Sequence, residues 1–254
     1  MKIFYSTLLL ILNKLGLNLI NRRLFHFCYF IIYHKFFCKR YPEDLFDNGY
    51  TELKEKFHLK DIDLDKYLNY ENFNFVMNAK KINLIDLKKI YSVMNNIGVI
   101  SIIKNYLGNK IYCYDNSNKT LGNQKSTDSS WQPHHDIKDR RLKIYIWLNE
   151  KNMNTHPLYY LRKTHKDIIS WQKYEDTRFP NIELNKFDKI YGEKGSIIIF
   201  DTHGIHSHFK ATTVHRSVIE LTFEPYGIFH RLNKKNINKE IARLDLIKLS
   251  QLLQ

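Results

Sequence analysis

A series of short apolar segments between about residue 111 and residue 225 restricts the fold of this chain more than any other feature. The segments that read as strands are KIYCYD (110–115), LKIYIWLN (142–149), LYYLR (158–162), DKIYG (188–192), GSIIIFD (195–201) and SVIELTFEP (217–225). They are bounded by polar or Gly-containing stretches, as strands of an all-β core are. The pattern predicts a β-sandwich or barrel with helices at its ends and excludes alternating βαβ units.

Helical patterns occupy the two ends of the chain. Residues 1–40 read as apolar helices with basic interruptions, and residues 41–82 as a polar, partly helical connector. Apolar residues at helical spacing predict a helix over 83–98 that stops at Gly98, followed by a second helix over 99–108. We therefore expect one domain with a helical N-terminal region (1–97), a β core (98–226) and a C-terminal helical segment (227–254), a size that fits the 254-residue length.

The chain is strongly basic, with 40 Lys and Arg against 26 Asp and Glu and a formal net charge of +14. This excess favours an anionic partner. The basic residues are scattered and not interleaved with stacking aromatics, so a nucleic acid is not expected. The three cysteines have no C-x-x-C spacing and cannot all pair, which supports neither a disulfide framework nor a zinc finger and makes a reducing cytoplasm the simpler assumption.

The N-terminal stretch MKIFYSTLLLILNKLGLNLI is apolar but is interrupted by Asn13 and Lys14 before it reaches membrane-spanning length. Together with LFHFCYFIIYHKFF (24–37) it could form amphipathic helices on a membrane surface, placing the protein at the inner face of the membrane. Helices packed on the domain's own core fit the same pattern equally well.

A candidate for chemistry is the HHD sequence at the head of the strand-like run 142–149. Side chains at i and i+2 of a strand share a face, so His134 and Asp136 lie together while His135 points away. A histidine and a carboxylate side by side are two members of the facial triad that binds iron(II) and leaves open coordination positions. The three-residue match alone is a weak signal, and an ordinary turn is the alternative.

A second cluster follows the apolar run 195–201. His203, His206 and His208 compete for the role of third ligand, although a histidine-rich turn can equally be a solvated or pH-sensitive loop. Arg216 begins the next apolar run, and its guanidinium fork matches a carboxylate. The residues by themselves predict a metal site beside a carboxylate clamp.

Residues 98–226 resemble the phytanoyl-CoA dioxygenase family, in a bacterial-type form. The resemblance rests on four segments in the family's order: HHD with LKIYIWLNE behind it, PLYYLRKTHK with Thr164 and His165 in place, GSIIIFDTHGIH, and Arg216 ten residues beyond. Within it His206, and neither His203 nor His208, takes the place of the second histidine ligand. His156 and Pro157 stand where the family commonly has Gly-Pro, and Arg162 and Lys163 where it has Pro-Gly, which bears on the substrate mouth and on no ligand.

The resemblance implies a double-stranded β-helix, also called a jelly roll, that uses iron(II), 2-oxoglutarate and O2. It implies that His134, Asp136 and His206 bind the metal and that Arg216 pairs with the distal carboxylate of 2-oxoglutarate. Further contacts to 2-oxoglutarate are expected from Tyr112, Lys143 and Trp147. Hydroxylation with release of succinate is the implied reaction, and Asp136 argues against a halogenase because a halide needs the place of that carboxylate.

The expected substrate is a small anionic metabolite or a glycan or lipid precursor. Two rival functions remain open at this stage: a non-catalytic jelly roll that binds a sugar or a metal, and a basic peripheral membrane protein. The polar stretch 115–130 is expected to be a loop, and its place next to His134 predicts a lid over the substrate.

Overall fold

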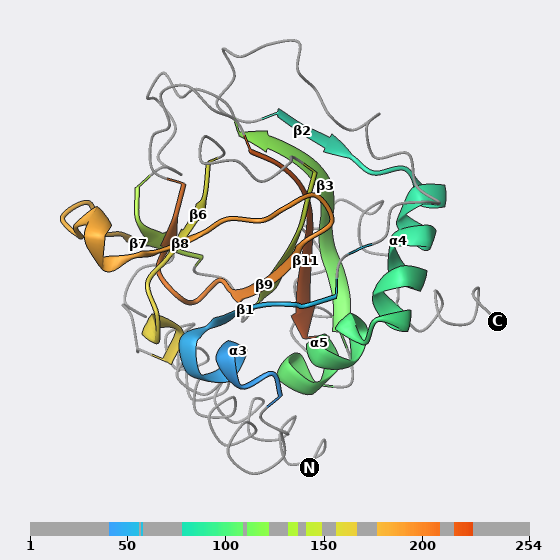
Figure 1. Cartoon of the computed structure of the whole chain (residues 1–254), viewed down its shortest axis with the longest axis horizontal. Coiled ribbons are helices and arrows are strands. Elements are labelled where there is room, and N and C mark those ends of the chain that lie inside the picture. The colour runs from blue at the N-terminus through green and yellow to red at the C-terminus, as the bar shows by residue number, and fades with distance from the viewer. Residues whose placement is uncertain are drawn as a thin grey trace, which may run out of the picture.

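The chain folds into two antiparallel β-sheets that face each other, with helices on the outer side of one sheet (Figure 1). The computed structural model describes residues 41–55, 57, 78–108, 111–121, 132–136, 141–148, 156–166, 177–208 and 216–225. The expected N-terminal membrane-surface helices (1–40) and the C-terminal helical segment (227–254) lie outside these residues. None of the described helices is long and apolar enough to cross a membrane.

The larger sheet has six strands in the order β1-β9-β5-β11-β3-β2. Its members are β1 (Tyr50–Glu52), β2 (Asn78–Lys81), β3 (Ile111–Leu121), β5 (Leu142–Trp147), β9 (Ile197–Asp201) and β11 (Arg216–Pro225). The smaller sheet has five strands in the order β7-β4-β10-β6-β8. Its members are β4 (His134–His135), β6 (Leu158–Tyr160), β7 (Thr177–Arg178), β8 (Asp188–Ile190) and β10 (His206–Ser207). This is the predicted double-stranded β-helix core.

Strand alternation divides the larger sheet into two apolar layers. On β5, Leu142, Ile144 and Ile146 belong to the core shared with the helices, while Tyr145 and Trp147 belong to the layer between the sheets. Successive side chains of a strand point to opposite faces, so one six-residue segment serves both layers. The candidate metal ligands described below lie on the face between the sheets.

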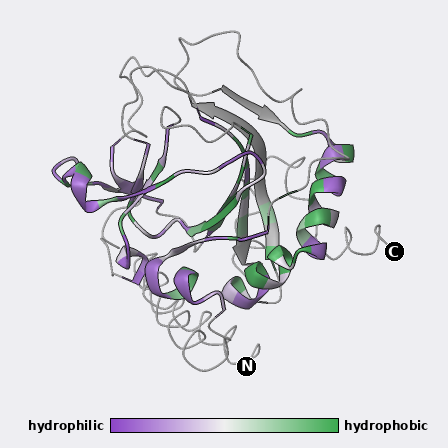
Figure 2. Cartoon of the chain, viewed as in Figure 1, coloured by the Kyte–Doolittle hydropathy of each residue, from purple (hydrophilic) through white to green (hydrophobic). Residues whose placement is uncertain are grey.

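The helices that cover the outer face are α4 (Leu84–Asn96) and α5 (Val99–Leu107) (Figure 1). The side chain of Asn83 accepts a hydrogen bond from the backbone N–H of Asp86 at 2.9 Å, which caps the first turn of α4. Gly98, at φ +79°, separates the two helices, as predicted from the sequence. Figure 2 shows α5 as largely hydrophobic, consistent with six of its nine residues being buried.

Two features of the fold differ from the sequence prediction. Residues 115–121, expected to begin a polar loop, instead form the second half of β3 and pair with β11 on one side. Residues 117–120 also pair with β2 on the other side. Backbone pairing needs no apolar side chains, so the polar composition of this segment was misleading. The rest of the expected loop, 122–130, lies outside the described residues. Strands β1 and β2 are also present in the stretch expected to be a partly helical connector, beside a short helix α3 (Glu43–Asn48).

Candidate metal centre

Two two-residue strands of the smaller sheet bring the candidate ligands together. His206 of β10 pairs directly with His134 of β4, so the two rings project from the same side of the sheet with their centroids 4.5 Å apart. Asp136 follows β4, and its backbone N–H donates to the carbonyl of Thr202 at 2.9 Å. One potential ligand atom from each of His134, Asp136 and His206 lies within 4.8 Å of the others.

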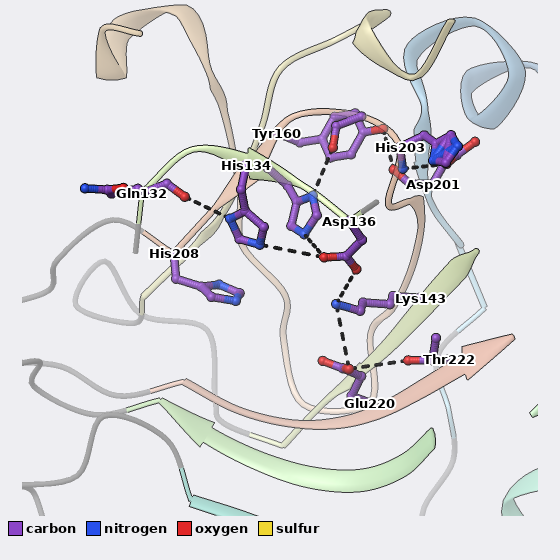
Figure 3. Close-up of polar contacts among 12 residues, drawn as sticks. Gln132, His134, Asp136, Lys143, Tyr160, Asp201, His203, His208, Glu220 and Thr222 are labelled. Atoms are coloured by element: carbon purple, nitrogen blue, oxygen red, sulfur yellow. Dashed lines mark hydrogen bonds and ion pairs between the residues drawn. The ribbon is translucent and has the colours of Figure 1, made fainter. Parts of the chain in front are cut away.

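Both imidazoles are held in the orientation that a metal ligand needs, which Figure 3 shows for His134. The Nδ1 atom of His134 lies 2.8 Å from the carbonyl oxygen of Gln132, and that of His206 lies 2.9 Å from the carbonyl oxygen of Gly204. A carbonyl can only accept, so each Nδ1 donates its proton and each neutral ring has a lone pair on Nε2. These Nε2 atoms lie 3.8 Å and 4.0 Å from Oδ1 of Asp136.

The electrostatics keep the histidines neutral and the aspartate ionised. Burial and the neighbouring His134 ring lower the pKa of His206 to about 3, and burial also lowers the pKa of His134. For Asp136, burial alone raises the pKa, but the Lys143 ammonium and the two imidazoles outweigh it and hold the pKa well below its usual range. Neutral imidazoles beside a carboxylate are the protonation states that bind a divalent cation.

A chain of charges leads from Asp136 to the larger sheet (Figure 3). The Nζ atom of Lys143 lies 3.0 Å from Oδ2 of Asp136 and 4.0 Å from Oε1 of Glu220. The Thr222 hydroxyl donates to the same Oε1 at 3.4 Å. Burial lowers the pKa of Lys143, but Asp136 and Glu220 raise it more, so this lysine stays charged.

Arg216 is fully buried on the same inner face, at the start of β11. Its guanidinium carbon lies 5.1 Å from the ring centroid of Tyr145 and 5.5 Å from that of Trp147, both cation–π distances. Its Nη2 donates to Nδ1 of His208 at 2.6 Å. Its Nε and Nη1 have no hydrogen-bond partner among the described residues.

The turn between β9 and β10 is fixed by a hydrogen-bond network around Asp201. The hydroxyl of Tyr106 donates to Oδ2 of Asp201 at 2.6 Å, and the backbone N–H of His203 donates to Oδ1 at 2.8 Å. The hydroxyl of Tyr160 donates to the Asp201 carbonyl at 2.8 Å. Since Gly204 in this turn supplies the carbonyl that orients His206, the network positions a candidate ligand.

The structure brings together some of the residues singled out in the sequence and separates others. His206 faces Asp136, whereas His208 contacts Arg216 and the ring of His203 lies 6.4 Å from that of His135. Thr164 accepts a hydrogen bond from the backbone N–H of Ile205 at 2.8 Å, next to His206.

The sequence-predicted residues of the larger sheet fall into three cases. Trp147 packs against Arg216 and Lys143 contacts Asp136, while the side chain of Tyr112 lies outside the described part of the chain. Sequence reasoning missed Glu220, Tyr106 and Asp201. A buried acidic residue in the apolar segment SVIELTFEP was the one signal that could have pointed to Glu220.

Comparison with known proteins gives structural likeness without a sequence match. No family model matches the chain, and no curated protein matches its sequence. Similar solved structures include the epimerase SnoN in complex with Fe3+, alpha ketoglutarate and nogalamycin RO, with 12% identity over 72% of this chain and 81% of SnoN and a TM-score of 0.49. HygX from Streptomyces hygroscopicus with nickel and 2-oxoglutarate bound is 9% identical over 72% of this chain and 85% of HygX, with a TM-score of 0.48. EctD from S. alaskensis with 2-oxoglutarate and 5-hydroxyectoine is 16% identical over 73% of this chain and 75% of EctD, with a TM-score of 0.49.

Each of these TM-scores is below 0.5, so the likeness alone does not tell what this chain binds. The fold and the site instead define the class on their own: a jelly-roll protein whose inner face has a His-Asp-His group that could hold a metal ion.

Proposed function

We propose that this protein is an iron(II)- and 2-oxoglutarate-dependent dioxygenase related to the phytanoyl-CoA dioxygenase family. The observation that carries the proposal is the pairing of two sites on one inner face. One is a group of two histidines and one carboxylate, and the other is a fully buried Arg216 with two unpartnered N–H-bearing nitrogens among the described residues.

The donor set fits iron(II). Two neutral imidazoles and one carboxylate form the facial triad that leaves coordination positions open for a cosubstrate. His134, Asp136 and His206 would hold the metal, through Nε2 of each ring and Oδ1 of the carboxylate. Iron with 2-oxoglutarate and O2 supplies oxidative decarboxylation to succinate coupled to oxidation of a substrate C–H bond, with hydroxylation as the proposed outcome.

The surroundings of Arg216 fit the distal carboxylate of 2-oxoglutarate. A buried guanidinium with unpaired N–H groups is costly, and a carboxylate that accepts hydrogen bonds from it lowers that cost. The rings of Tyr145 and Trp147 hold the guanidinium in place. Trp147 therefore acts on the cosubstrate through Arg216, and Tyr112 remains a candidate for direct contact, whereas the ammonium of Lys143 faces Asp136 at 3.0 Å.

The proposed substrate is a small anionic metabolite or a glycan or lipid precursor, and the proposed location is the cytoplasm. The support for an anion is the net charge of +14, and the support for the location is the absence of a cysteine framework in the sequence. Peripheral membrane contact through residues 1–40 stays a proposal on the sequence pattern alone.

The experiment that tests this function is an anaerobic titration of metal-free protein with iron(II) and then with 2-oxoglutarate. We expect a weak visible charge-transfer band from the chelate, which is lost in His206→Ala and weakened in Arg216→Ala. A folded protein that binds iron but gives no band with 2-oxoglutarate would contradict the proposal and favour a non-catalytic metal-binding jelly roll.

A further inference from the structure

The two oxygens of Asp136 have different surroundings. Oδ1 faces the Nε2 atoms of both His134 and His206, at 3.8 Å and 4.0 Å. Oδ2 faces the ammonium of Lys143, at 3.0 Å. The carboxylate therefore presents one oxygen to the candidate metal position and the other to a fixed cation.

Lys143 is itself fixed by the larger sheet. It lies on β5, directly across from Thr222 of β11, and its ammonium is 4.0 Å from Oε1 of Glu220. The Glu220 side chain is almost fully buried and is contacted by the Thr222 hydroxyl at 3.4 Å. A buried carboxylate needs a compensating charge, so Glu220 holds the ammonium at this position and not elsewhere on the inner face.

We propose that Lys143 is a positioning residue that keeps Asp136 a one-oxygen ligand, with Glu220 as its anchor. This inference rests on the proposed function, because it requires a metal at His134, Asp136 and His206. It gives Lys143 a different role from the cosubstrate contact expected from the sequence.

Two consequences follow from the charge and the geometry. A cation on Oδ2 withdraws electron density from the carboxylate and repels a divalent metal, so Lys143 weakens metal binding. By occupying Oδ2 it also stops the carboxylate from chelating the metal with both oxygens, so the positions that a bidentate cosubstrate needs stay open. Lys143 thus lowers the affinity for the metal and raises the affinity of the metal-loaded protein for the cosubstrate.

The opposite sign of these two effects separates this role from a structural one. A lysine that merely stabilises the fold would lower both affinities when removed. We expect Lys143→Met to bind cobalt(II) about tenfold tighter than the wild type, which corresponds to about 1.4 kcal/mol of relieved repulsion between the ammonium and the metal. We expect the same variant, once metal-loaded, to bind 2-oxoglutarate at least about tenfold more weakly.

The measurements are a competition titration of cobalt(II) against a chromophoric chelator and an anaerobic titration of the metal-loaded proteins with 2-oxoglutarate. Because Lys143→Met removes the cation that faces Glu220, the double variant Lys143→Met/Glu220→Gln is measured beside it and is expected to behave alike. Lys189→Met removes one positive charge from an exposed position of β8 and is expected to leave both affinities unchanged.

Cobalt(II) affinity that is unchanged or lower in the folded double variant overturns the inference, and so does unchanged 2-oxoglutarate affinity. Failure of the proposed function has a different signature. A wild-type protein that binds cobalt(II) but not 2-oxoglutarate refutes the dioxygenase and the predicted change in 2-oxoglutarate affinity. The predicted change in cobalt(II) affinity is still tested in that case, because its measurement needs no 2-oxoglutarate. A wild-type protein that binds no metal overturns both proposals.

Discussion

Gly204 offers a sharp test of how the turn between β9 and β10 supports the candidate metal centre. A methyl group added at this position would lie 1.8 Å from the hydroxyl of Tyr160 and 2.3 Å from its ring carbon Cζ. An ordinary contact needs at least 3.4 Å, so the hydroxyl must retreat by about 1.6 Å. The Tyr160 ring is fully buried against Tyr50 and Phe200, which leaves it little room.

The expected cost of Gly204→Ala has two parts. Overpacking a filled interior costs about 1–3 kcal/mol. Loss of the 2.8 Å hydrogen bond from Tyr160 to the Asp201 carbonyl adds about 1–2 kcal/mol. We expect the free energy of unfolding to fall by about 2–5 kcal/mol, measured by urea denaturation followed by tryptophan fluorescence. Because the Gly204 carbonyl orients His206, we also expect cobalt(II) affinity to fall by about 10-fold to 100-fold.

Gly98→Ala is the matched control. It places the same methyl group at a left-handed residue with nothing within 4 Å, far along the chain from the candidate metal ligands. It should cost about 1–2 kcal/mol from backbone strain alone and leave metal affinity unchanged. A Gly204→Ala protein with the stability of Gly98→Ala and with wild-type cobalt(II) affinity would refute the reasoning.

Four further predictions concern neighbouring parts of the site. Arg216→Lys keeps the charge but not the planar fork, so 2-oxoglutarate affinity measured by calorimetry should fall at least about tenfold while metal affinity stays unchanged. Gly192→Ala would place a methyl group within 2.2 Å of the Trp147 indole, so it should lower 2-oxoglutarate affinity through Arg216 as well as thermal stability, and an unchanged melting temperature would contradict the packing. The pKa of His206 is lowered to about 3, so between pH 6.5 and 3 the unfolded metal-free chain binds a proton that the folded one does not. As the pH is lowered from 6.5 to 3, the free energy of unfolding should therefore decrease, and it should decrease less steeply in His206→Gln. Metal at 100 times its dissociation constant should stabilise the wild type by about 2.7 kcal/mol in calorimetric scans but not Asp136→Ala.

The strands that could be predicted from the sequence are those with apolar runs, including the short segments LYYLR and DKIYG, which correspond to β6 and β8. Segments LKIYIWLN and GSIIIFD correspond to β5 and β9, and SVIELTFEP to β11, because burial on both faces leaves a nearly continuous apolar pattern. Strands β1, β2, β7 and β10 and the polar half of β3 were missed. Their pairing is made by backbone groups to partners distant in sequence, and no local pattern records it.

The candidate site divides in the same way. The spacing of His134 and Asp136 and the position of His206 are visible in the sequence, since each belongs to a short motif. The hydrogen bond from Tyr106 to Asp201 joins residues 95 positions apart, and the contact between Lys143 and Glu220 depends on the pairing of β5 with β11. Such residues are brought together by topology and become apparent only in the folded chain.

The two-sided strand β5 has a consequence for how accurately the protein must fold. A slip of one residue in its pairing with β9 or β11 would move the ammonium of Lys143 into the helix-covered core and turn Ile144 toward the candidate metal ligands. That error would bury the Lys143 charge among aliphatic side chains and remove aliphatic side chains of β5 from the core, so misregistered chains are strongly disfavoured. Burial of the aliphatic side chains on the outer face of β5 thereby fixes the register that places Lys143 on the inner face.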